Sequence, residues 1–168
     1  DFSRERLVKE FEFIKQKDPT RQVMVSRSNN ATPSWPIGEP RADIVGASIY
    51  KRVFDKTITN RYFEYPYPAW FYAFLAGATE ITTTRNTMIH ELQTEAWLPE
   101  PLSMKTAPLE EMYKTFGPDD VADRIKYGVD TGIRRIDLWG VEWWLHLKEN
   151  RNAPEIWDNA KATIESYR

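Results

Sequence analysis

Glu91 is the residue of this sequence whose type and position best suit catalysis. It follows the apolar pair Met88-Ile89 near the end of a short apolar segment, and Gln93 and Trp97 come soon after it. A carboxylate at the exit of a strand can attack an anomeric carbon and form a glycosyl-enzyme, provided that hydrogen-bond donors keep it ionised. A solvated or ion-paired glutamate gives the same pattern, so spacing alone leaves both interpretations open.

Two neighbours of Glu91 suggest other chemistry. Glu95 competes for the role of nucleophile, but we expect it in the loop beyond the strand, which favours Glu91. His90 suggests zinc, yet HELQT lacks the second histidine of the HExxH motif, and neighbouring residues of a strand point to opposite faces. The sequence therefore predicts no metal and no cofactor.

Aromatic side chains are unusually frequent, at 14% of residues with seven tryptophans. Carbohydrate sites use such rings because the apolar face of a sugar packs on a flat aromatic surface, although tryptophan also fills cores. We expect the Tyr50 hydroxyl to donate a hydrogen bond to the Glu91 carboxylate, which would keep it ionised. The predicted substrate-binding residues are Trp139, Tyr50, Trp35, Trp97, Gln93 and Glu95.

Hydrophobic periodicity and turn residues divide the chain into alternating helices and strands. The predicted helices cover residues 3–17, 68–79, 108–116, 118–131 and 154–167. The predicted strands cover residues 22–27, 42–50, 87–93 and 134–139. Residues 28–40 and the segment rich in Tyr and Pro before residue 68 are predicted loops. This order indicates βα units around a parallel sheet. A doubly wound sheet fits the same order, but no glycine-rich phosphate turn follows the first strand.

Four segments, in this order, resemble the last four strands of the clan A retaining glycoside hydrolases of the cellulase-family glycosylhydrolase type. They are DPTRQVMVSRS, ADIVGASIY, TMIHELQTEAW and RRIDLWGVEWW. The resemblance implies an α/β fold, namely the C-terminal half of a (β/α)8 TIM barrel with strands five to eight. It makes Glu91 the nucleophile at the end of the seventh strand and Trp139 an aromatic platform at the exit of the eighth. The family's acid/base glutamate belongs to the fourth strand, which has no counterpart here.

The length agrees with half a barrel. The chain has 168 residues, whereas a complete barrel takes roughly 250. It opens with Asp1 rather than Met, so we expect residues 1–168 to be a single partial domain of a longer protein, inactive alone. The partner it needs is the missing N-terminal half-barrel, on the same polypeptide or on a separate chain.

Bulk composition excludes several classes of function. The net charge is -2 without a long basic run, which argues against a nucleic-acid partner. The absence of cysteine excludes disulfides and thiolate chemistry. The longest strongly apolar stretch, residues 69–78, is about half of what a spanning helix needs. We therefore expect a soluble chain with no membrane segment, whose cellular location the sequence does not indicate.

The sequence thus predicts an O-glycosyl hydrolase that cleaves a β-linked glycan with retention, with Glu91 as nucleophile. Its partner molecule is a carbohydrate substrate. The alternative is a non-catalytic carbohydrate-binding or scaffold protein, in which the half-barrel assembles with another half but catalyses nothing.

Overall fold

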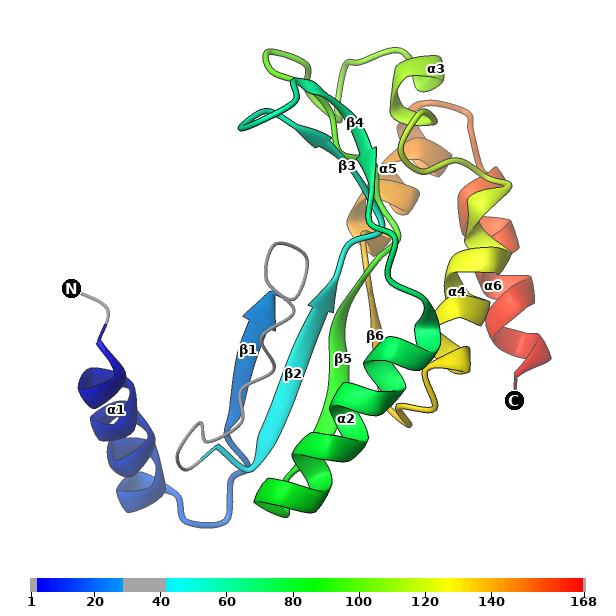
Figure 1. Cartoon of the computed structure of the whole chain (residues 1–168). Helices are drawn as coiled ribbons and strands as arrows, with labels where there is room; N and C mark the ends of the chain where they lie inside the picture. The colour runs from blue at the N-terminus through cyan, green and yellow to red at the C-terminus, as the bar shows by residue number, and fades with distance from the viewer. Residues whose placement is uncertain (1–2, 29–41, 168) are drawn as a thin grey trace.

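A four-stranded parallel sheet forms the centre of the protein (Figure 1). The computed structural model describes residues 3–28 and 42–167. The strands are, in their spatial order, β1 (Met24–Ser28), β2 (Ile44–Ile49), β5 (Asn86–Gln93) and β6 (Ile136–Trp139). All pair in parallel, so their carboxyl ends meet at one edge of the sheet. The predicted α/β class and parallel sheet are confirmed.

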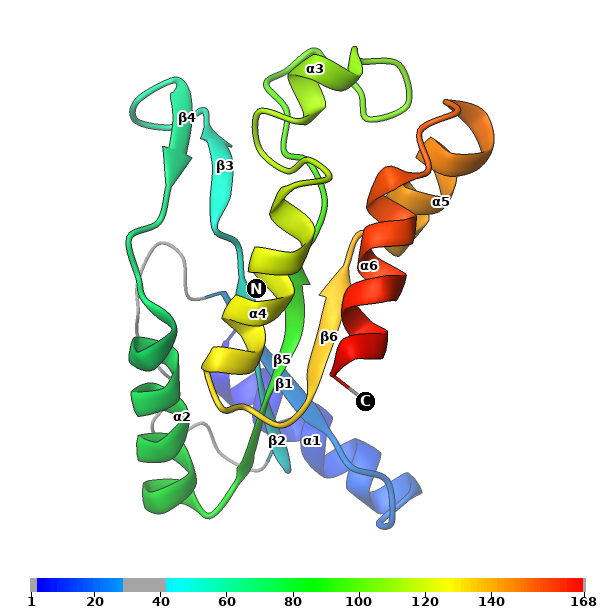
Figure 2. The same ribbon diagram turned by 90° about the vertical axis from the view of Figure 1, so that its right-hand side faces the viewer.

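Helices cover one face of this sheet, as Figure 2 shows for α2, α4 and α6. The helices are α1 (Arg4–Lys17), α2 (Ala69–Thr83), α3 (Leu109–Met112), α4 (Asp120–Asp130), α5 (Val141–Asn150) and α6 (Glu155–Ser166). None of the helices in the described part of the chain has the length and apolar character needed to cross a membrane.

Two apolar clusters hold these layers together. In the first, Val45 of β2 and Ile89 and Leu92 of β5 are fully buried in one cluster with Tyr72 of α2. Helix α4 approaches this cluster closely, because a Cβ on Gly128 would lie only 2.7 Å from Leu92 Cδ2. The second cluster joins α3, α4, α5 and α6, and its largest buried side chains are Met112, Phe116, Trp143, Trp144, Leu147 and Ile156.

Most predicted elements are present, with ends that differ by a few residues. The first helix begins after Ser3, whose hydroxyl accepts the Arg6 N–H at 3.2 Å as an N-cap. The predicted helix over 108–116 contains only the single turn α3. Helix α5 was not predicted, since the sequence after the last strand was left without an assigned element.

The segment before α2, predicted as a loop, contains a β-hairpin of β3 (Arg52–Asp55) and β4 (Arg61–Glu64). The Asp55 carboxylate fixes its turn by accepting the backbone N–H groups of Thr57 and Thr59. The Thr59 hydroxyl also donates to this carboxylate, at 2.8 Å. That hydrogen bond first, and then the backbone ones, lower the pKa of Asp55 to about 2. The hairpin and α3 stand at the end of the sheet where the strands finish (Figure 1).

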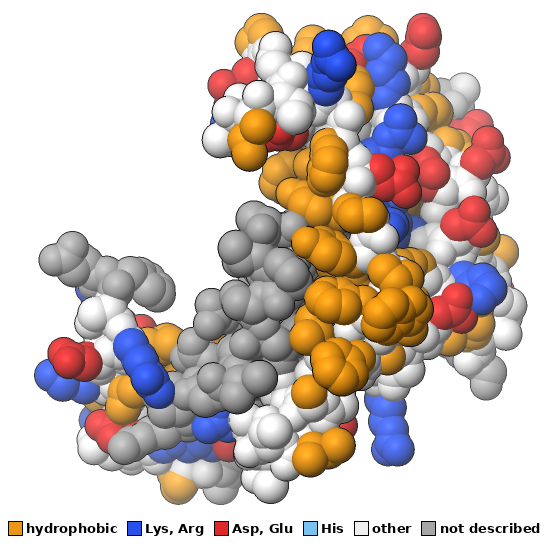
Figure 3. All heavy atoms as spheres, in the orientation of Figure 1, with side chains coloured by type: hydrophobic (Ala, Val, Ile, Leu, Met, Phe, Trp, Pro, Cys, Tyr) orange, Lys and Arg blue, Asp and Glu red, His pale blue; other side chains and the backbone are white. Residues whose placement is uncertain are grey.

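Residues 68–79 have the apolar composition of a buried helix, but α2 is buried on one side only. The outer side of α2 leaves Trp70 67% and Phe74 64% exposed, and Ile81 near its end is 83% exposed. Figure 3 shows hydrophobic side chains gathered along this side of the molecule. In α2 the buried residues are Tyr72, Ala76 and Thr79, and Leu75 packs partly buried against the core.

Candidate functional site

A β-bulge in β5 determines how the candidate catalytic residues lie. Ala47 pairs with Ile89 but Ser48 pairs with Glu91, so His90 is an extra residue in β5. The register to β6 shifts over the same stretch, between Ile89 and Leu92. Bulges re-aim side chains and are frequent beside active sites.

The bulge overturns the expectation that His90 and Glu91 point to opposite faces. His90 Nδ1 lies 3.6 Å from Glu91 Oε1, so both side chains lie on the same face of the sheet. This distance is too long for a hydrogen bond. His90 Nε2 contacts the hydroxyls of Ser26 at 2.6 Å and Ser48 at 2.9 Å. Gly46 leaves room for the ring, because a Cβ there would lie 2.9 Å from His90 Cδ2.

This serine, histidine and glutamate set resembles a nucleophile with its base, but the third link is missing. A hydrolytic triad needs the carboxylate to accept a hydrogen bond from the imidazole, and the 3.6 Å separation of His90 Nδ1 from Glu91 Oε1 does not provide one. No group of three or more metal-ligating side chains occurs among residues 3–28 and 42–167. The histidine therefore serves best as a polar neighbour of Glu91.

The predicted hydrogen bond between Tyr50 and Glu91 is present. The Tyr50 hydroxyl donates to Glu91 Oε2 at 3.0 Å across the carboxyl ends of β2 and β5. Burial, and next the hydrogen bond to Glu91, raise the pKa of Tyr50 above its ordinary value. The phenol therefore stays protonated at neutral pH and keeps donating to the carboxylate.

Glu95 lies beyond the end of β5, as expected, and its carboxylate is tied to Trp139. The indole Nε1 of Trp139 donates to Glu95 Oε1 at 2.9 Å. Burial raises the pKa of Glu95, while the hydrogen bonds from Trp139 and Trp97 act in the opposite direction. The charge of Glu142, and to a smaller extent that of Glu91, raises this pKa further.

The indole of Trp139 is 46% exposed and that of Trp97 is 42% exposed. Trp97 packs edge to face on Tyr50, with ring centroids 5.1 Å apart. Its backbone N–H donates to the Thr115 hydroxyl at 2.9 Å, which holds the loop in place. The structure therefore brings Tyr50, Glu91, Glu95 and the two exposed indoles together at the carboxyl ends of the strands. Trp35, also predicted to bind substrate, lies outside the described residues.

Gln93, which the sequence predicted to bind substrate, has a fully buried side chain. Its Oε1 accepts the backbone N–H groups of Lys51 at 2.8 Å and Arg52 at 3.0 Å, and Arg124 of α4 at 2.9 Å. Its Nε2 donates to the carbonyl oxygens of Arg52 and Glu95. All hydrogen-bonding positions of the amide are thus used inside the protein, and Gln93 fixes the hairpin to β5.

Two residues that support the site, Arg124 and Gly140, were not predicted from the sequence. Arg124 is 8% exposed, and burial lowers its pKa to about 10. Gly140, at φ 131°, lets the chain pass Glu95, since a Cβ there would lie 2.7 Å from Glu95 Cβ and 2.9 Å from the Thr94 carbonyl oxygen. A glycine directly after a strand was the only signal of this close approach.

Helix α5 also supports the site. The Trp144 indole donates to the Thr94 carbonyl oxygen at 2.5 Å. The Thr94 hydroxyl in turn donates to the Trp139 carbonyl oxygen at 2.7 Å. The segment that carries Glu95 is therefore anchored to both β6 and α5.

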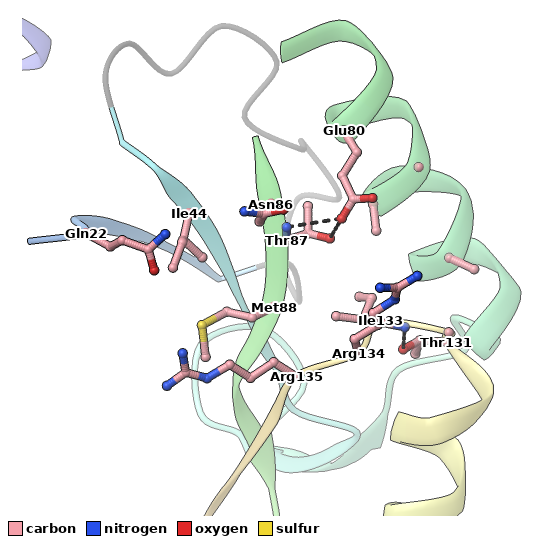
Figure 4. Close-up of a pocket in the computed structure, with 14 residues that line it drawn as sticks. Gln22, Ile44, Glu80, Asn86, Thr87, Met88, Thr131, Ile133, Arg134 and Arg135 are labelled. Atoms are coloured by element: carbon pink, nitrogen blue, oxygen red, sulfur yellow. Dashed lines mark hydrogen bonds between the residues drawn. The ribbon is translucent and has the colours of Figure 1, made fainter. Parts of the chain in front are cut away.

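A hollow of about 620 Å³ lies at the end of the sheet opposite to Glu91, where the strands begin (Figure 4). It is lined by the first residues of strands, such as Ile44 and Asn86, and by Glu80 of α2. Glu80 Oε1 accepts the Thr87 hydroxyl at 2.6 Å and the Thr87 backbone N–H at 3.2 Å. In βα folds the amino ends of the strands serve stability, whereas the carboxyl ends carry the residues that do chemistry. We therefore locate the candidate site at the carboxyl ends, around Glu91, and not in this hollow.

Comparison with models of known protein families finds no match, and neither does comparison with curated proteins or with solved structures.

Proposed function

We propose that this chain is the C-terminal half of a (β/α)8 barrel of a retaining glycoside hydrolase that acts on a β-linked glycan. Glu91 is the nucleophile in this proposal, and the acid/base glutamate belongs to the other half of the barrel. The observation that carries the proposal is the hydrogen bond from Tyr50 to Glu91. It joins two strand ends beside exposed indoles.

The sheet supports the half-barrel. Its order β1-β2-β5-β6 follows the chain without reversal, as a barrel requires and a doubly wound sheet does not. Parallel sheets are normally covered on both faces, yet Met24 of the edge strand β1 is 39% exposed. A second half-barrel would cover this side chain and pair both edges of the sheet.

The environments of the two glutamates favour Glu91 over Glu95 as nucleophile. A nucleophile must be ionised, and Glu91 accepts a hydrogen bond from a phenol that stays protonated. Burial raises the pKa of Glu95 and so favours its protonated form. One of its two oxygens, Oε1, accepts the Trp139 indole N–H, which suits a residue that positions the aromatic platform.

In the proposed reaction, a Glu91 oxygen attacks the anomeric carbon and the glycosidic C–O bond breaks. The leaving oxygen takes a proton from the acid/base glutamate. Water then attacks the glycosyl ester with help from the same glutamate, which restores the Glu91 carboxylate and releases the sugar with retained configuration. Carboxyl groups about 5 Å apart are needed for this mechanism, which is why this chain alone should not turn over.

The alternative function is a carbohydrate-binding or scaffold protein that keeps the rings without hydrolysis. Exposed indoles at the strand ends are equally useful for binding alone. Hydrolysis of aryl β-glycosides by the full-length protein distinguishes the two.

We expect Glu91→Gln to lower kcat by roughly 10⁴-fold or more, as removal of a nucleophile does. Glu95→Gln should cost far less, and Glu149→Gln, at an exposed position of α5, should have no effect. Glycan binding without hydrolysis by the unaltered protein would favour the alternative, and equal losses for Glu91→Gln and Glu149→Gln would contradict the role of Glu91.

A further inference from the structure

The outer side of α2 carries an apolar stripe formed by Trp70, Phe74 and Ile81, all of them exposed. With Gly77 between them, these positions are spaced by four, three and four residues. Residues at this spacing lie along one side of a helix and form the contact seam when a second helix packs beside it. The described part of the chain therefore presents a helix seam without covering it.

The stripe is free of charge. Glu80 is the one charged residue of α2, and its Oε1 accepts hydrogen bonds from the hydroxyl and the backbone N–H of Thr87 at the start of β5. An uncharged surface can be buried against a copy of itself without leaving an ion unpaired, whereas it offers no complementarity to a strongly acidic or basic partner. The composition of the stripe therefore favours an apolar partner such as the stripe itself.

The stripe is also complementary to itself when two copies of α2 run antiparallel. A twofold axis through the middle of the helix would place Trp70 opposite Ile81 of a second copy. The same axis would place Phe74 opposite Gly77, where a Cβ would have no atom within 4 Å. The ring of one copy would thus fill the space above the glycine of the other, and the symmetry would repeat both contacts.

Aromatic rings beside the stripe hold it in a fixed conformation. Trp70 packs edge to face on Phe71 at a centroid distance of 6.2 Å, and Phe71 stacks on Tyr67 at 5.2 Å. The Tyr67 carbonyl oxygen accepts hydrogen bonds from the Tyr127 hydroxyl at 2.8 Å and from Lys51 Nζ at 3.3 Å. Hydrophobic side chains continue from α2 towards the hairpin (Figure 3). Side chains that are already ordered lose little conformational freedom on association.

The exposed area is large enough to form the centre of an interface. An aromatic side chain buries roughly 150–250 Å² when it is fully covered, and Trp70 is 67% and Phe74 64% exposed. The two rings would thus remove roughly 400–650 Å² from water over two copies, about a third of the roughly 1,600 Å² of a standard interface. Ile81 and the rings beside the stripe add to this area.

We infer that the outer side of α2 is the contact surface of a homodimer, in which the α2 helices of two copies pack antiparallel. The other half-barrel of the proposed function does not compete for this surface. It pairs with the edge strands β1 and β6, whereas α2 packs on β2 and β5 in the middle of the sheet. The inference goes beyond the proposed function and does not depend on hydrolysis of a glycan.

Sedimentation velocity of the full-length protein over a wide range of concentrations tests the dimer. Phe74→Glu would bury a carboxylate without a partner in each half of the interface, so the dissociation constant should rise about 30-fold or more, as for the loss of a central interface residue. The side chain is exposed in the single copy, so the urea midpoint of the monomer should not change. The matched control is Ile58→Glu in the hairpin, at a residue that is 88% exposed, which should leave the dimer intact.

Disulfide cross-linking tests the antiparallel arrangement. Residues 1–168 contain no cysteine, and Trp70→Cys and Ile81→Cys are made as separate variants. Along a helix these positions are roughly 16 Å apart, so in an antiparallel pair neither variant can reach its own copy, because a disulfide needs Cα atoms within about 7 Å. An equal mixture of the two variants should give a covalent dimer on oxidation, with a disulfide between positions 70 and 81 in peptide mass spectrometry.

Three results would overturn the inference. They are a protein that stays monomeric at every concentration, a dimer that Phe74→Glu weakens no more than Ile58→Glu does, and a cross-link that one cysteine variant forms with itself as readily as the mixture does. If Phe74→Glu instead destabilises a monomeric protein, another part of the same polypeptide covers the stripe, and the homodimer is again excluded.

Discussion

Gln93→Leu should destabilise the protein strongly, because the Gln93 amide joins the start of the hairpin, β5 and α4. Leucine has a similar volume but no polar atoms. The backbone N–H groups of Lys51 and Arg52 would lose their acceptor, and the carbonyl oxygens of Arg52 and Glu95 would lose their donor. Arg124 would keep only the Gln93 main-chain oxygen.

The magnitude follows from these groups. Each buried polar group without a partner costs about 1–3 kcal/mol. These contacts are only partly buried, so water can reach them once the hairpin relaxes, and each should cost about 1 kcal/mol. With four such groups, we expect the free energy of unfolding to fall by about 4 kcal/mol, a large share of the 5–15 kcal/mol typical of a domain.

Urea unfolding followed by tryptophan fluorescence measures this change. The matched control is Gln16→Leu on the exposed side of α1, which should alter the free energy by less than about 0.5 kcal/mol. A stability within about 1 kcal/mol of the unaltered protein, together with weakened glycan binding, would refute the structural role of Gln93 and restore the interpretation that it contacts the ligand.

Three further predictions concern the site. Tyr50→Phe removes the hydrogen bond to Glu91, so kcat of the full-length protein should fall roughly 10- to 100-fold, since hydrogen bonds to charged groups contribute about 1.5–3 kcal/mol; an unchanged kcat would contradict it. Because the pKa of Glu95 is raised in the folded state above its ordinary value of 4.5, the folded state holds the proton more tightly, and stability is lost as the pH rises from 4.5 through the folded pKa. Glu95→Gln should therefore gain stability relative to the unaltered protein over this pH range, measured by urea unfolding at several pH values, and a constant difference would count against it. Gly140→Ala forces an alanine to φ 131° with its Cβ 2.7 Å from Glu95 Cβ, so the free energy of unfolding should drop by about 1–3 kcal/mol, and a neutral result in the same assay would show that the turn can relax.

The sequence was sufficient for those features that depend on pattern. Apolar segments such as residues 42–50 and 87–93, alternating with helical ones, indicated parallel strands. Parallel strands end at a common edge, which is why a contact between Tyr50 and Glu91 could be predicted although 41 positions separate them.

Local exceptions to the pattern could not be predicted. No glycine or proline marks the bulge at His90, so strict alternation was assumed. Counted from Glu91 with a period of two, Gln93 would face the same side, yet its amide is held by Arg124 and the start of the hairpin. The hairpin itself has no Asn-Gly turn, and depends instead on the carboxylate of Asp55.

Covalent trapping tests the central claim most directly. A 2-deoxy-2-fluoro β-glycoside with an activated leaving group slows hydrolysis of the glycosyl ester, so the ester accumulates on the nucleophile. Peptide mass spectrometry of the treated full-length protein should find the sugar on Glu91. A label on Glu95 or on another carboxylate, or a protein that hydrolyses glycosides without ever acquiring a label, would contradict the assignment of Glu91 as the nucleophile.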